Sequence, residues 1–278
     1  MKKLLDFLYS LPEYNALIES VQNNKSVAAT EIGQINRSHI IAGLYSHLER
    51  PIVVICQDDA TAKRLQDELR AFLGITPSIL PSRELTLYDT AVASRTWEQK
   101  RLRQFYKLLS GETTLQIISW DALSQRTMPC SILKEAAFTL QVGKSYNIEL
   151  ILSKLDASGY SRAPMVEGPG QFALRGGILD IFSPSDDYPF RAEFFGDELD
   201  TLGYFDPSTQ RRTENIDDAT IIPVAETQPT LHPGGRQGLC RDIASLIQRQ
   251  KRRKNLNNEL IATLEQDLQK YQNNQSFT

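Results

Sequence analysis

Three arginines, Arg162, Arg175 and Arg191, stand in three neighbouring segments of residues 159–210. A guanidinium group is a planar fork of donors that recognises phosphate or carboxylate groups. Residues 159–206 hold nine acidic residues, three arginines and no lysine, a net charge of −6. That sign opposes binding to the phosphates of nucleic acid. The acidic surroundings favour recognition of a protein, where arginines are frequent hot spots. The alternative is that each arginine only pairs with a neighbouring acid on a solvated face.

Short alternating runs separated by Gly, Pro and Asp predict that residues 159–210 form an antiparallel meander. Along residues 190–194 the apolar side chains share one face, so Arg191 and Glu193 share the other. Tight bends or turns are predicted at Gly176-Gly177, Gly196-Asp197 and Asp206-Pro207.

Residues 1–125 alternate strand-like and helical segments, which predicts an α/β domain with a mostly parallel sheet. The strand-like runs are residues 26–30, 51–56, 77–80 and 115–119. The helical segments are residues 39–48, a helix between a cap at Asp58 and a stop at Gly74, and one from Ser94 to Leu109.

Nucleotide-binding proteins of this architecture carry G-x-x-x-x-G-K-[ST] after the first strand. Here residues 31–38 have Glu31 and Asn36 in place of the two glycines, Arg37 in place of the lysine, and Ser38 at the last position. A phosphate cradle needs backbone N–H groups close to the anion, and glycines allow that path. The sequence therefore predicts a P-loop-NTPase-like domain with a degenerate Walker A loop that does not bind ATP.

The remaining composition indicates neither a catalytic nor a metal site. The three cysteines are far apart and lack C-x-x-C spacing, which predicts reduced thiols in a cytoplasmic protein. None of the three histidines has a carboxylate or Cys at metal-ligand spacing, and no nucleophile-elbow motif is present. The formal net charge of −3 gives no overall attraction to nucleic acid or an anionic membrane, and no run is long and apolar enough to predict a membrane span.

Residues 126–210 are predicted to form a smaller, inserted α+β domain with a strand at 137–142, a helix at 147–158 and then the meander. A strand at 220–224 is expected to return to the first sheet, so that residues 211–278 complete the first domain. Residues 236–274 are predicted to form one long helix or a helical hairpin. They carry a basic run, for which a solvated or protein-facing surface is favoured and a nucleic-acid contact stays open: Arg249, Lys251, Arg252, Arg253 and Lys254.

Several motifs in order over about 50 residues resemble the UvrB-like module of bacterial nucleotide excision repair, found in UvrB and in the transcription-repair coupling factor (Mfd) family. They are Gly159-Tyr160, Gly-Gly-Ile-Leu-Asp-Ile-Phe at 176–182, Arg-Ala-Glu-Phe-Phe-Gly-Asp-Glu at 191–198 and Phe-Asp-Pro-Ser-Thr-Gln-Arg at 205–211. Residues 80–89 look like a Pro-x-x-Glu-x-x-x-Tyr-Asp stretch of coupling factors. UvrB has an intact phosphate loop and a long aromatic β-hairpin, and this sequence shows neither. The chain is therefore similar to the N-terminal region of the coupling-factor family.

The resemblance implies that the small domain docks UvrA, the damage-recognition ATPase of DNA repair, without being an enzyme. Carried over by motif, the docking residues are Arg162, Arg175, Arg191 and Glu193. Ala173 stands where UvrB has a further arginine, which implies a smaller or weaker interface.

In such a family the fragment recruits UvrA to DNA damage where RNA polymerase has stalled. The contacts with RNA polymerase and DNA, and the ATP and Mg of the helicase-like translocase, belong to domains outside this chain. Two alternatives remain: a UvrB-type ATP- and damaged-DNA-binding subunit, and a scaffold whose docking surface is masked by other domains of its own chain.

Overall fold

The computed structural model describes residues 2–82, 96–226, 232–253 and 257–272. These residues form two compact units. The first comprises Met1–Glu84 with Arg103–Thr127, and the second Leu85–Leu102 with Met128–Thr278. The unit boundary therefore passes through one helix, at residue 102. Most of the motif predicted at 80–89, and the proposed cap Ser94, lie outside the described residues.

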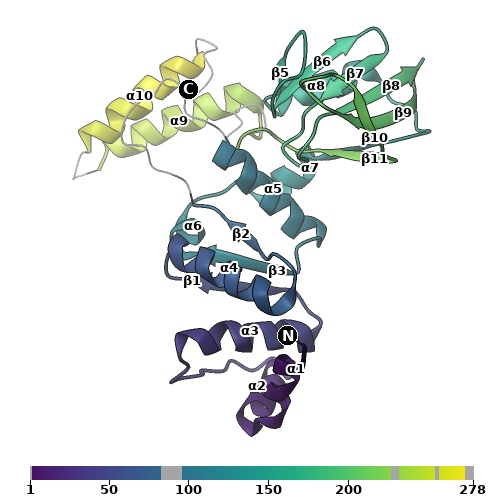
Figure 1. The fold of residues 1–278 in the computed structure, drawn as a ribbon. Helices are drawn as coiled ribbons and strands as arrows, with labels where there is room; N and C mark the ends of the chain where they lie inside the picture. Colours follow the sequence, from purple (N-terminus) through teal and green to yellow (C-terminus); the bar gives the residue numbers. More distant parts are fainter. Residues whose placement is uncertain (1, 83–95, 227–231, 254–256, 273–278) are drawn as a thin grey trace. The chain divides into compact units, whose positions relative to one another are not determined.

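The first unit is an α/β arrangement around a parallel sheet with strand order β1-β3-β2 (Figure 1). Its elements are α1 (Lys2–Asp6), η1 (Phe7–Ser10), α2 (Pro12–Gln22), α3 (Gln34–Leu48), β1 (Ile52–Cys56), α4 (Asp59–Leu73), β2 (Ser78–Leu80), the second half of α5 (Thr96–Ser110), β3 (Leu115–Ser119) and α6 (Trp120–Ser124).

Alternation along the strands decides which helices cover the parallel sheet. Leu115 and Ile117 of β3 point to α3 and α4, where they pack with Leu65 and Leu69. Ile118 points to the other face and packs with residues of α5 and α6. The predicted ends of α4 are confirmed: the Asp58 carboxylate accepts a hydrogen bond from the Thr61 N–H at 2.7 Å, and Gly74 ends the helix with φ +74°. The α/β prediction is thus correct for these residues.

The prediction of a strand at residues 26–30 is wrong. This stretch is extended but pairs with no described strand, and all its residues are exposed. Val27 is its only large apolar side chain, so pairing would bury little. The following helix also begins earlier than predicted, at Gln34, because Gly33 serves as its N-cap.

The second unit contains the antiparallel sheet. Its elements are the first half of α5, α7 (Cys130–Ala136), β4 (Phe138–Gln141), α8 (Ile148–Ala157), β5 (Ser161–Arg162), β6 (Gln171–Arg175), β7 (Ile178–Ile181), β8 (Phe190–Phe195), β9 (Glu198–Phe205), β10 (Arg212–Asn215), β11 (Asp218–Ile221), α9 (Gly235–Lys251) and α10 (Asn258–Gln272).

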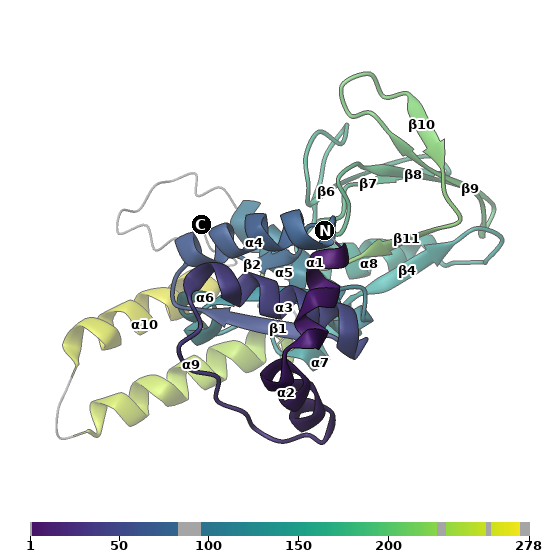
Figure 2. The same ribbon diagram turned by 60° about the horizontal axis from the view of Figure 1, so that its bottom comes forward.

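The six-stranded sheet runs in the order β10-β9-β8-β7-β6-β5, antiparallel except for the β5–β6 pair. The predicted meander is therefore confirmed. One face packs on α8 and on the β4–β11 ribbon (Figures 1 and 2), through a core that includes Leu155, Leu179 and Phe190. Gly176 and Gly177 form the β6–β7 turn. Gly176 has φ +61°, and a Cβ on Gly177 would lie 2.8 Å from the Phe194 carbonyl oxygen, so this turn requires both glycines.

The return strand does not join the parallel sheet as predicted. Instead β11 pairs with β4 in an antiparallel ribbon, with Ile221 opposite Phe138 and Ala219 opposite Leu140. Ala219 and Ile221 are buried in the core of the second unit, and that burial holds the strand there. Residues 211–278 accordingly fall in the second compact unit, which differs from the predicted completion of the first domain.

Helices α9 and α10 form the helical hairpin that the sequence left as one of two possibilities (Figure 2). Lys251 forms an ion pair of 2.7 Å with Glu265, and an Arg236 guanidinium N–H donates to the Tyr271 carbonyl at 3.3 Å. Ile247 and Ile261 are buried. Lys254, the last residue of the basic run, lies outside the described residues.

Two features are absent from the residues that the structure describes. None of the helices is both long and apolar enough to cross a membrane, and in the same residues no cluster of His, Cys, Asp and Glu has the grouping of a metal site.

A buried ion pair ties α5 to the segment after β11. Arg101 Nε lies 2.6 Å from Glu226 Oε1, and both side chains are completely buried. We expect Glu226→Gln to leave the Arg101 charge without this carboxylate and to destabilise the fold by about 3 kcal/mol or more. Urea unfolding checks this, with Lys63→Gln as control, because Lys63 belongs to an exposed pair that should contribute little. Equal midpoints for Glu226→Gln and the unchanged chain would contradict the prediction.

Candidate protein-docking face

The face of the six-stranded sheet opposite its core carries a row of paired residues from four strands. Ala173, Asp180, Arg191 and Gly203 lie side by side across β6, β7, β8 and β9. The neighbouring row places Arg175, Ile178, Glu193 and Thr201 next to one another. Because side chains alternate between the faces of a strand, both rows point away from the core, and we call this surface the outer face.

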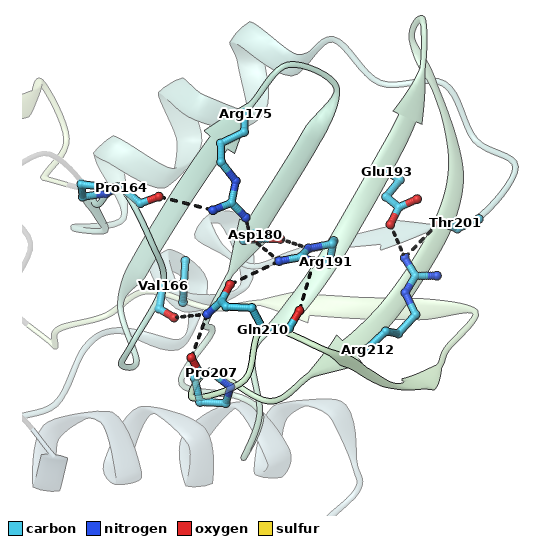
Figure 3. A network of polar contacts seen from close by, with 10 residues as sticks. All are labelled: Pro164, Val166, Arg175, Asp180, Arg191, Glu193, Thr201, Pro207, Gln210 and Arg212. Carbon is cyan, nitrogen blue, oxygen red and sulfur yellow. Dashed lines mark hydrogen bonds and ion pairs between the residues drawn. The ribbon is translucent and has the colours of Figure 1, made fainter.

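The carboxylate of Asp180 is the centre of the outer face (Figure 3). Arg191 donates to both of its oxygens, from Nε at 2.7 Å and from an Nη at 3.0 Å, and Arg175 donates from an Nη at 2.5 Å. The Asp180 side chain is fully buried, whereas 17% of Arg191 and 43% of Arg175 is exposed. The buried Asp180 carboxylate therefore holds two guanidinium groups at the surface. Their hydrogen bonds and positive charges compensate the cost of burying the carboxylate.

Arg191 is the more constrained of the two arginines. Its guanidinium lies 4.7 Å above the Phe205 ring and donates to the carbonyl and side-chain oxygens of Gln210, at 3.4 and 3.3 Å. Gln210 belongs to the β9–β10 turn and in turn donates to the carbonyls of Val166 and Pro207 (Figure 3). The hydrogen bonds to Asp180 raise the pKa of Arg191 further above its ordinary value, so the side chain is a permanent cation.

A second ion pair lies beside the first on the outer face. Arg212 of β10 donates to Glu193 at 2.8 Å and to the Thr201 hydroxyl at 3.1 Å. Glu193 is one of the residues predicted from the sequence, whereas Arg212 is not. The available signal was the alternation of Arg212 and Glu214 after the predicted turn, but only the register of β10 against β9 brings Arg212 to Glu193.

Arg162 lies apart from this network. It is on the short edge strand β5 in register with Phe172, a residue of the core-facing row. Its side chain is exposed and forms no ion pair with another described residue. The structure thus brings together Arg175, Arg191 and Glu193 of the predicted docking residues, and leaves Arg162 at the sheet edge.

Apolar side chains border the charged network. Ala173 is buried in a small cluster with Val166, Phe182 and Phe205, so this position adds no donor to the surface. At the β8–β9 hairpin, Phe195 is 85% exposed and follows Arg191 and Glu193 on the outer face of β8. Guanidinium groups beside an exposed aromatic ring have the composition of a protein-binding surface. Such a surface offers hydrogen bonds to carboxylates and carbonyls.

The predicted degenerate phosphate loop occupies the start of α3. Glu31 is exposed with φ +61°, and Gly33 is the N-cap. Arg37 donates to the Ile32 carbonyl at 3.4 Å, and the buried Ser38 hydroxyl donates to the Ile35 carbonyl at 3.0 Å. These side chains therefore satisfy the local backbone, and the Ser38 hydroxyl faces its own helix.

Comparison with known proteins finds a matching family and several similar chains. Residues 138–226, which contain the whole outer face, match the UvrB interaction domain family. The chain is 28% identical to a transcription-repair-coupling factor of Myxococcus xanthus over 76% of its residues, and 29% identical to that of Escherichia coli over 67%. A Bacillus subtilis relative of the same name is 27% identical over 81%.

The matched regions make up 18%, 16% and 19% of those three relatives, so the chain spans less than a fifth of their length. Residues 138–226 thus match the UvrB interaction domain family, within a chain that is similar to the N-terminal region of transcription-repair coupling factors.

Proposed function

We propose that this chain recruits the excision-repair protein UvrA by docking it on the outer face of the antiparallel sheet. In a full-length coupling factor, such recruitment brings UvrA to a lesion where RNA polymerase has stalled, while other domains engage the polymerase and DNA. The observation that carries the proposal is the Asp180-centred arginine pair, because it lies within the residues that match the UvrB interaction domain family.

The rigidity of the arginine pair supports docking. A flexible surface arginine loses side-chain entropy when it is fixed in an interface. Asp180 and Gln210 already hold Arg191, so binding costs less there. Arg175 is the more exposed of the two and is also held by Asp180, which leaves it available to meet a carboxylate of the partner. Arg162, at the sheet edge, belongs to the proposed interface only as a peripheral contact.

The acidic background of the domain supports a protein partner over nucleic acid. Residues 159–206 carry three times as many acids as arginines, and a phosphate backbone would be repelled. A protein surface with a few well-placed carboxylates can pair with the arginines without approaching the remaining acids.

The geometry of residues 31–38 supports a chain without nucleotide chemistry. Glu31 would place a carboxylate beside a bound phosphate, and the Ser38 hydroxyl already donates to Ile35. We therefore propose that ATP, Mg and translocase activity belong to other parts of the longer protein.

The docking proposal predicts a loss of affinity in Arg175→Ala/Arg191→Ala. We expect UvrA binding, measured by calorimetric or anisotropy titration, to weaken at least about thirtyfold, because central interface arginines typically contribute about 2 kcal/mol or more. Lys63→Ala/Lys144→Ala serves as the control, since both lysines are exposed and outside the outer face. Equal affinities for the arginine variant and the control would contradict the site, and absence of binding by the unchanged chain would contradict the function.

Asp180→Asn should weaken UvrA binding although both arginines remain. The Asn amide has no negative charge and only one acceptor oxygen, and its NH2 group would face guanidinium donors, so the arginines lose their fixed geometry. We expect a loss of about tenfold in the same titration, largely in the dissociation rate. Circular dichroism must show a folded variant. A folded Asp180→Asn protein with unchanged affinity would show that the arginines act without this support.

The chain should not show saturable binding of a fluorescent ATP analogue in the presence of Mg. The expected titration is linear, and equals that of the Arg37→Ala variant. Saturable binding that Arg37→Ala abolishes would support the UvrB-type alternative instead.

A further inference from the structure

Charge is divided unequally between the two helices of the C-terminal hairpin. Six of the seven charged residues at 235–253 are basic, and Asp242 is the single acid. Residues 257–272 instead carry three acids and one lysine. A surface that serves only solubility carries positive and negative charges together. The charges on α9 are almost all positive, which solubility alone does not require.

The basic residues of α9 follow the exposed side of the helix. Steps of three and four residues place side chains on one helical face. At that spacing, five exposed residues extend over about 16 Å of the axis at 1.5 Å per residue: Arg241, Ser245, Gln248, Arg249 and Arg252. We call these five residues the α9 donor face. Each of its side chains offers at least one hydrogen-bond donor, and none carries a negative charge.

Asp242 and Glu265, two acids of the hairpin, contact residues outside the α9 donor face. Asp242 lies 3.2 Å from His232 Nε2, and Glu265 pairs with Lys251. For Arg241, Arg249 and Arg252, no ion pair with any described acid is present. The helix dipole explains basic residues in the last turn, but Arg241 lies more than two turns earlier. The helix dipole therefore does not account for Arg241.

We propose that the α9 donor face binds the phosphate backbone of duplex DNA without reading its sequence. Arg, Gln and Ser are side chains that contact DNA phosphates, and duplex DNA presents about one charge per 1.7 Å of its axis. A straight row of cations matches a repeating anion along its whole length, whereas a single acidic side chain of a protein would satisfy one of them. The α9 donor face shares no residue with the proposed UvrA-docking face, and its proposed ligand is different.

The test is fluorescence anisotropy of a labelled duplex titrated with the whole chain at several salt concentrations. About three phosphate contacts predict that log K falls with log salt at a slope near −2.7. Arg241→Gln/Arg249→Gln/Arg252→Gln should bind at least about tenfold more weakly at low salt, with a slope close to zero. The control, Lys63→Gln/Lys144→Gln/Arg211→Gln, removes the same net charge from exposed cations elsewhere and should keep affinity and slope.

Three outcomes would overturn the proposal. They are no duplex binding at low salt, an equal loss in both triple variants, and displacement of the duplex by poly-glutamate at matched charge concentration, which would identify an acidic protein as the ligand class. Circular dichroism and the UvrA titration on the same variants confirm that a loss of DNA binding does not come from unfolding.

Discussion

The carboxylate of Asp180 links the fold of the antiparallel sheet to its surface chemistry. A carboxylate that is fully buried without partners costs several kcal/mol, so the sheet is stable only in a register that brings cations to it. That register places Arg191 directly opposite Asp180 and brings Arg175 from the next strand. A slip of one residue would turn Asp180 into the core. Selection of the correct strand pairing and assembly of the proposed docking face therefore rest on the same hydrogen bonds.

The two arginines bound to Asp180 differ in how many contacts hold them. Arg191 is fixed by Asp180, the Phe205 ring and Gln210, and it is the less exposed of the pair. Arg175 has only Asp180 and a long hydrogen bond of 3.5 Å to the Pro164 carbonyl. In the proposed interface, Arg191 is therefore a preorganised anchor, and Arg175 is a side chain with room to adjust. This combination suits recognition of a protein surface, where geometry and adaptability both contribute.

Sequence patterns predicted most of the local structure because local physics determines it. Alternation at 190–194, the Asp58 cap and the Gly74 stop required no knowledge of distant contacts. Pairing between segments was harder to foresee. The strand predicted at 220–224 and found at 218–221 pairs with β4 and not with the parallel sheet, because its apolar alternation fits any half-buried edge. Arg212 was missed, and Arg162 grouped with the other arginines, because neither strand register nor face can be read from spacing along the chain.

The two proposed surfaces use arginine in physically different ways. On the outer face, the guanidinium groups are partly buried and paired internally, so salt screens them weakly and their contribution to binding comes from geometry. On α9 the cations are exposed and have no acidic partner among the described residues, and their attraction for phosphate depends on counterion release. Rising ionic strength therefore weakens the α9 donor face long before it affects the outer face. Under these two proposals, the chain would hold its protein partner at an ionic strength that already weakens its contact with DNA.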